Sequence, residues 1–113
     1  MMEIRHNGQI ISQKVRLADS FWTRLLGYMF SARPVTDDGI YFDPGRSIHT
    51  FFMRFNLDVV FLRKDGLVVK ILRDLKPWRM TWVYFRADHV LELPSGKLPH
   101  EVKEGDKLEV KHV

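Results

Sequence analysis

The sequence predicts a mainly β (α+β) fold, a small antiparallel barrel or sandwich with one short helix near the N-terminus. Short alternating or apolar segments recur along the chain, Gly, Pro, Asn and Asp separate them, and a single segment has a convincing helical pattern. A length of 113 residues suits one domain. Because no repeat or linker divides the chain, we expect a single domain over residues 1–113.

The N-terminal elements are predicted from turn and cap residues. Asn7-Gly8 joins two short segments and is typical of a type I′ hairpin, in which both central residues need positive φ. Residues 13–17 alternate apolar and polar side chains and predict a half-buried strand. Asp19 or Ser20 can cap a helix over residues 20–26, whose apolar side chains recur four residues apart.

The rest of the chain predicts further strands. The clearest hairpin joins the apolar run at residues 57–62 to residues 67–72 through Asp65-Gly66. Alternating or apolar character also predicts strands at residues 40–42, 47–53, 82–85, 89–93 and 108–111. Many short strands with frequent turns favour an antiparallel architecture over a βαβ fold.

The composition excludes several kinds of chemistry. Without cysteine the chain cannot form disulfides, thiolate zinc sites, iron–sulfur clusters or cysteine nucleophiles. Residues 1–15 lack the apolar stretch of a signal peptide or membrane-spanning helix. We therefore expect a cytoplasmic protein without a membrane partner.

Several ordered segments resemble one protein family. They are residues 21–30, residues 47–62 with the following Lys64-Asp65-Gly66, Lys76-Pro77-Trp78-Arg79, residues 90–96, and Gly105-Asp106. In order and spacing they are similar to the DUF192 (UPF0127) family. The resemblance implies a small, mainly β domain without an established activity.

Catalytic and metal-binding patterns are weak. Ser47, His49 and Asp58 are the nearest set to a nucleophile, base and orienter, but no G-x-S-x-G turn is present, and a hydrolase around His49 and Asp58 is the hypothesis with least support. The five histidines form no H-x-H or H-x-x-x-H pair, so a metal site would have to be assembled by the fold, for example from His49, His89 and Glu92. We expect no metal and no cofactor. Glu92 is expected to face solvent or pair with an arginine.

The positive charge is concentrated in residues 63–86. Seven basic and two acidic residues give this segment +5, which leaves −1 for the rest of a chain whose net charge is +4. Trp78, Trp82, Tyr84 and Phe85 lie within it, so single-stranded nucleic-acid binding is one hypothesis. Against it, strand spacing would bury Trp82 and Tyr84 on one shared face.

The first functional hypothesis is a non-catalytic binding or accessory module for a small anionic or peptide ligand. Its candidate site residues are His49, Arg54, Asp58, Lys76, Trp78 and Arg79. Arg54 and Arg79 would hold an anion, Trp78 would cover the apolar part of the ligand, and Asp58 would orient Arg54.

Overall fold

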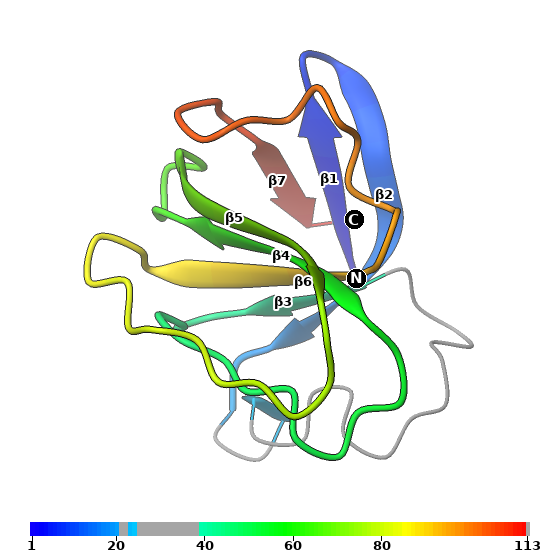
Figure 1. Ribbon diagram of the computed structural model, residues 1–113. Coiled ribbons are helices and arrows are strands. Elements are labelled where there is room, and N and C mark those ends of the chain that lie inside the picture. The colour runs from blue at the N-terminus through cyan, green and yellow to red at the C-terminus, as the bar shows by residue number, and fades with distance from the viewer. Residues whose placement is uncertain (21–22, 25–38, 113) are drawn as a thin grey trace.

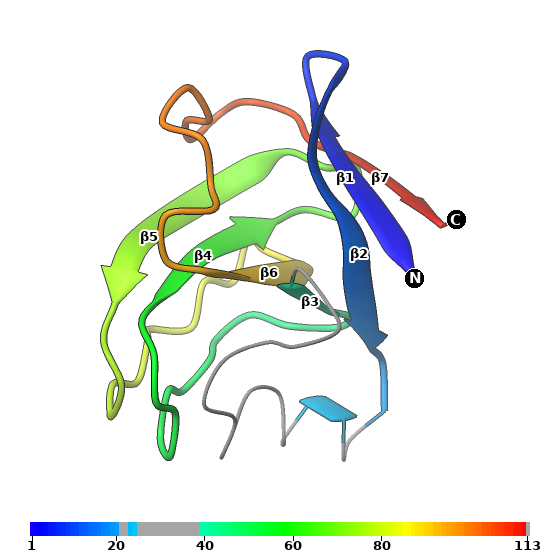
Figure 2. The same cartoon turned by 90° about the vertical axis from the view of Figure 1, so that its right-hand side faces the viewer.

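The computed structural model describes residues 1–20, 23–24 and 39–112, and its core is one strongly curled sheet (Figures 1 and 2). The strands are β1 (Met2–His6), β2 (Gln9–Ala18), β3 (Gly39–Phe42), β4 (Leu57–Leu62), β5 (Val68–Leu75), β6 (His89–Pro94) and β7 (Glu109–His112). Their order across the sheet is β5-β4-β6-β3-β2-β1-β7. Neighbouring strands are antiparallel except β2 and β3, which are parallel. The mainly β prediction is confirmed, in the form of a curled, half-barrel sheet.

The two clearest hairpin predictions are confirmed. Asn7 and Gly8 have φ of 52° and 79°, as the turn between β1 and β2 requires. Strand β4 covers the predicted residues 57–62, and its partner β5 begins one residue later than predicted and extends to Leu75.

The curl brings the two edge strands of the sheet together at one corner. The segment before β7 bonds to the start of β5: Leu108 N–H donates to Gly66 O (2.9 Å), Val68 N–H to Asp106 O (2.8 Å) and Gly105 N–H to Val68 O (2.9 Å). These bonds satisfy edge groups that would otherwise be free to pair with another chain.

The sheet is buried on both faces. Along β4, Leu57, Val59 and Phe61 point to one face, and Val60 and Leu62 point to the other. The inner cluster, within the curl, is Met2, Ile4, Val15, Tyr41, Val60, Leu62, Val68, Leu91, Leu93, Leu98, Val102 and Leu108. The outer cluster is Ala18, Ile40, Phe42, Met53, Leu57, Val59, Phe61, Ala87 and Val90. Two-sided burial explains why β4 is a continuous apolar run rather than an alternating one.

Two irregular segments, residues 45–56 and 76–87, lie against the outer cluster; we call them the cover segments. Figure 1 shows them as the green and yellow-green loops at the bottom of the molecule. They are bonded to each other along their length: Thr50 N–H donates to Arg79 O (2.8 Å), Thr81 N–H to Ile48 O (3.0 Å) and Tyr84 N–H to Arg46 O (2.8 Å).

The predicted strands at residues 47–53 and 82–85 are therefore wrong. Only an isolated bridge between His49 and Met80 has β geometry here. The chain turns at Phe52, whose φ is 64°, and the cover packs onto the sheet through side chains instead of joining its hydrogen-bond ladder. Trp82 and Tyr84 do not share a buried face, because Trp82 is exposed while Tyr84 lies with its ring centroid 4.5 Å from that of Phe61.

The predicted helix at residues 20–26 is not confirmed. Of this range the structure describes residues 20 and 23–24, and the other positions lie outside the described residues. Thr23 and Arg24 are helical, and Ser20 Oγ accepts from Thr23 N–H (3.2 Å), as the predicted cap requires. Among the residues that the structure describes, no helix is long and apolar enough to cross a membrane.

Gly66 provides a test of the corner where the sheet edges meet. Its φ is +93°, and a Cβ added to it would lie 2.2 Å from Leu108 O. We expect Gly66→Ala to lower the free energy of unfolding by about 3 kcal/mol, combining backbone strain with a steric clash. Chemical denaturation measures the effect.

Gly96→Ala is the matched control. Gly96 also has positive φ, +88°, but nothing lies within 4 Å of the added Cβ, so only the backbone cost of about 1 kcal/mol is expected. Equal losses in the two variants would show that the contact with Leu108 does not matter.

Candidate binding surface

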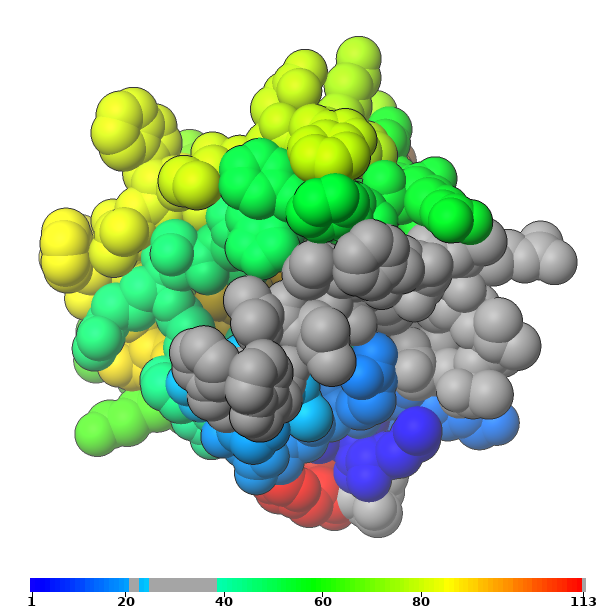
Figure 3. Space-filling model, turned by 90° about the horizontal axis from the view of Figure 1, so that it is seen from below, coloured from blue at the N-terminus to red at the C-terminus, as the bar shows by residue number. Residues whose placement is uncertain are grey.

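The outward side of the cover segments combines exposed apolar side chains with positive charge. Residues 45–56 and 76–87 contain five arginines and lysines and no aspartate or glutamate. Six of the eight exposed large hydrophobic side chains of the described residues are here: Phe52, Trp78, Met80, Trp82, Val83 and Phe85. We call these six, with Arg46, Arg54, Lys76, Arg79 and Arg86, the aromatic–basic face. Seen from below, the green and lime-to-yellow segments gather along one side, and several lime-to-yellow side chains project outward (Figure 3).

Thr50 fixes the part of this face that contains the predicted Lys76–Arg79 loop. Its side chain is fully buried, and its hydroxyl donates to Lys76 O (2.7 Å) and accepts from Arg79 N–H (2.8 Å). Its backbone adds two bonds, since Thr50 O accepts from Trp78 N–H (2.9 Å) and Thr50 N–H donates to Arg79 O (2.8 Å). One residue thus holds both ends of a tight loop.

Aromatic rings support the same loop from beneath. The rings of His49 and Phe51 stack with centroids 5.1 Å apart, and Trp78 lies 6.0 Å from Phe51 and 4.8 Å from Phe52. Phe52 and Trp78 both have positive φ, 64° and 63°, which is uncommon for large side chains. The surrounding hydrogen bonds hold these conformations and leave Trp78 56% exposed.

The structure brings together most of the site residues predicted from sequence. His49, Lys76, Trp78 and Arg79 surround Thr50, as described above. Arg54 is exposed on the same cover segment, between the buried Met53 and the half-buried Phe55.

Asp58 is not part of this group. Its carboxylate is buried and accepts from three backbone N–H groups, those of Asp74 (3.0 Å), Gly96 (3.0 Å) and Leu98 (3.2 Å). Along β4 it shares the face of Val60 and Leu62, opposite to the cover segments. Asp58 therefore neither orients Arg54 nor faces His49, and it joins the β5 end to the loop after β6.

The basic segment at residues 63–86 does not form one continuous surface. Arg63 pairs with Asp65 (3.8 Å) and Lys70 with Glu104 (3.8 Å). The Arg73 guanidinium donates to the carbonyls of Leu98, Pro99 and Val102, so it fastens a loop. Of the basic residues in this segment, those on the aromatic–basic face are the C-terminal three, Lys76, Arg79 and Arg86.

His89, which a metal site built with His49 and Glu92 would need, is engaged by two other side chains. His89 Nδ1 is bonded to the Tyr41 hydroxyl (2.8 Å), and its Nε2 lies 3.1 Å from an Asp43 oxygen. Burial raises the pKa of Tyr41, with Asp43 and Asp88 adding to the effect, so this phenol stays protonated. Among the described residues, no three His, Asp or Glu side chains are grouped to hold a metal ion.

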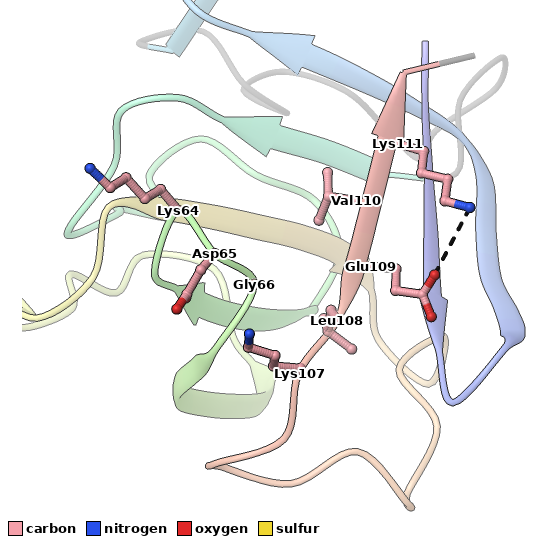
Figure 4. Close-up of a pocket in the computed structure, with 8 residues that line it drawn as sticks. All are labelled: Lys64, Asp65, Gly66, Lys107, Leu108, Glu109, Val110 and Lys111. Carbon is pink, nitrogen blue, oxygen red and sulfur yellow. Dashed lines mark ion pairs between the residues drawn. The ribbon is translucent and has the colours of Figure 1, made fainter.

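A separate groove of about 370 Å³ lies between the β4–β5 turn and β7 (Figure 4). It is lined by Lys64, Asp65, Gly66 and residues 107–111. Its lysines do not converge, since Lys64 extends away from Lys107, and Lys111 pairs with Glu109 at 4.0 Å. The groove therefore offers no concentrated anion site.

Of the two expectations for Glu92, a solvent-facing carboxylate is wrong, whereas an arginine, Arg16, does lie near it. Glu92 is buried on β6 between Ile40 and Val59, on the face of the outer cluster. Burial raises its pKa to about 8, and the nearby Arg16 opposes the shift. A carboxyl group held neutral beside an apolar cluster is a destabilising element that the sequence pattern did not reveal.

Comparison with known proteins places the chain in a family. The DUF192 family, described as "Uncharacterized ACR", matches residues 2–110. The chain belongs to the DUF192 family. A UPF0127 protein of Pyrococcus horikoshii is 38% identical over 102 residues, covering 84% of this chain and 85% of that protein. A UPF0127 protein of Pyrococcus furiosus is 38% identical over 109 residues, covering 90% of each. This confirms the resemblance inferred from the sequence.

Solved structures share the fold of this DUF192 protein. A Sinorhizobium meliloti protein described as a candidate transcription regulator has a TM-score of 0.80 at 24% identity, covering 96% of this chain and 91% of its own. A Novosphingobium aromaticivorans protein of unknown function has a TM-score of 0.78 at 20% identity, covering 96% and 82%. At these identities the likeness concerns the fold alone.

The role of the Thr50 hydroxyl in holding the Lys76–Arg79 loop can be tested by substitution. Thr50→Val keeps the shape of the side chain but leaves Lys76 O and Arg79 N–H without their buried partner. We expect a loss of about 2 to 4 kcal/mol in the free energy of unfolding and faster amide hydrogen exchange at Trp78 and Arg79. Thr50→Ser retains the hydroxyl and should keep slow exchange at both amides. Fast exchange in the serine variant as well would contradict the role given to the hydroxyl.

Glu92 gives a prediction of pH dependence. Its pKa is about 8 in the folded chain and near the ordinary 4.5 when unfolded, so between these values the folded state holds a proton that the unfolded state releases. The free energy of unfolding should therefore fall as the pH rises through this window, by at most about 1.4 kcal/mol for each pH unit within it. Denaturation of Glu92→Gln across the same pH range should show a smaller decline. Identical pH profiles for the two proteins would exclude Glu92 as the cause.

Proposed function

We propose that this DUF192 protein is a non-catalytic binding module that holds an anionic ligand with an apolar body at the Lys76–Arg79 end of the aromatic–basic face. The observation that supports it best is the way Thr50 fixes this loop, with two cations and a half-exposed tryptophan displayed together. A loop already held in place loses little conformational entropy when a ligand binds.

Each side chain has a distinct part in this proposal. Trp78 offers an apolar surface supported by Phe52 and Phe51. Lys76, Arg79 and Arg54 are exposed and supply positive charge; neither cover segment contains an acidic residue, and Asp74, just before the second segment, interacts with Lys76. His49 Nδ1 accepts from Phe51 N–H (3.3 Å), so the histidine acts here as a support of the loop.

Single-stranded nucleic acid is the second candidate ligand. The exposed rings and the acid-free cover favour it, since bases stack on aromatic side chains and phosphates attract cations. The distribution of charge supports only a short contact, because Arg63, Lys70 and Arg73 are engaged elsewhere.

Anilinonaphthalene sulfonate is a suitable first probe, because it joins one negative charge to an aromatic body. We expect the folded protein to bind it, and Trp78→Ala and the double variant Lys76→Gln/Arg79→Gln each to weaken binding about tenfold. The uncharged N-phenylnaphthylamine should respond to the tryptophan variant alone. Fluorescence titration at low and high salt measures both dyes.

Lys97→Gln/Lys103→Gln is the matched control, since it removes the same charge from two exposed lysines outside the cover segments. Its affinity should equal that of the unaltered protein. If the control weakens binding as much as Lys76→Gln/Arg79→Gln does, the effect is one of net charge and the proposed site is wrong. Competition by a short single-stranded oligonucleotide that is lost with Trp78→Ala would favour the second candidate.

A further inference from the structure

The other end of the aromatic–basic face, residues 80–86, has a different character from the Lys76–Arg79 loop. Trp82 and Phe85 are 82% and 83% exposed, and Met80 is 72% exposed. The rings of Trp82 and Phe85 contact no other aromatic ring of the described residues, whereas the Trp78 ring contacts those of Phe51 and Phe52. These side chains project from the molecule instead of lying on it.

Folding does not require these projecting side chains. The same stretch anchors itself through its inward residues, since Tyr84 packs on Phe61 and the fully buried Ala87 belongs to the outer cluster. The outward positions could be polar without loss to the core. An exposed apolar group of this size is typical of a surface that contacts a partner.

Cations lie next to the projecting group in sequence and on the paired cover segment. Arg79 and Arg86 flank it in sequence, Arg46 lies opposite Tyr84 on the paired cover segment, and none of residues 76–87 is acidic. Arg46 contributes only in part, because it donates to Ala87 O (3.0 Å) and lies 4.0 Å from Asp88. An apolar tip with a positive rim complements an anionic lipid surface, where phosphates lie above acyl chains.

The side chains favour a bilayer over a nucleic acid or a peptide groove. Met80 and Val83 are exposed but have no flat ring on which a base could stack. Tryptophan and phenylalanine that are exposed on nearly all sides can enter a fluid medium that surrounds them, and tryptophan is favoured at the headgroup level.

We propose that residues 80–86 dock this protein on anionic bilayers, with Trp82 and Phe85 entering the headgroup region and Arg79 and Arg86 contacting lipid phosphates. The contact is peripheral and needs no membrane-spanning segment. It differs from the expectation of no membrane partner, because a peripheral contact of this kind requires no long apolar run in the sequence. It shares Arg79 with the ligand site at the Lys76–Arg79 loop, but its apolar side chains, Trp82 and Phe85, are not part of that site.

The test is sedimentation of the full chain with phosphatidylcholine vesicles that contain or lack phosphatidylserine. We expect binding to the anionic vesicles, a loss with rising salt, and a loss of about tenfold or more in Trp82→Ala/Phe85→Ala. Tryptophan emission should shift to the blue on binding, and the shift should be smaller in Trp82→Phe. Both replaced side chains project into solvent, so the variants should keep the thermal unfolding midpoint of the unaltered protein.

Two controls separate this proposal from its alternatives. Ile10→Ser removes an exposed apolar side chain far from the cover, in β2, and should bind vesicles normally. Trp78→Ala should weaken dye binding but retain most vesicle binding, so failure of one proposal is distinguishable from failure of the other. Absence of vesicle binding at low salt, equal losses in Ile10→Ser and the double variant, or binding of an oligonucleotide in place of vesicles would each overturn the proposal.

Discussion

Strand β4 has no face open to solvent, and the rest of the molecule is arranged to meet that condition. The inner face of the sheet is covered by the sheet itself, which curls until the segment before β7 bonds to the start of β5. The outer face cannot be covered in the same way, so the cover segments supply the missing layer. Burial of an apolar strand thus determines both the curl and the presence of a layer without regular secondary structure.

The cover segments do not belong to the hydrogen-bond ladder of the sheet, so other hydrogen bonds must hold their backbone in place. In a strand, the ladder satisfies each N–H and C=O, but between residues 45–56 and 76–87 those bonds are scattered, and side chains take part in them. Thr50 is the clearest case, because its hydroxyl and its peptide groups together bind both ends of the Lys76–Arg79 loop. Two large residues with positive φ are tolerated next to it, which gives Trp78 its exposed position.

The sequence predicted the regular part of the fold well and the irregular part poorly, for one physical reason. Alternation and turn residues report local backbone preference, and they located β4, the hairpin at Asn7-Gly8 and most of β5 and β6. Residues 47–53 also alternate, but there the apolar side chains pack on a sheet to which the segment does not belong. Likewise, the residues next to Asp58 in sequence do not indicate that its carboxylate accepts three backbone hydrogen bonds. Two of the donors, Gly96 and Leu98, are far away in sequence and lie near Asp58 only in the folded chain.

The same reasoning separates what folding requires of the cover from what it leaves free. Ile48, Met53, Tyr84 and Ala87 face the outer cluster, and replacing them would expose it. Outward positions carry no such requirement, and a layer held only for packing would be expected to place polar or mixed-charge side chains there. This layer instead has six large hydrophobic side chains and five cations, without one acidic residue. An ordinary solvent-facing surface has no need of this combination, whereas an anionic and partly apolar partner complements it in both charge and polarity. For this reason we propose that this DUF192 protein binds its partners on the outside of its cover, whereas the acids Asp58 and Glu92 are buried in the sheet.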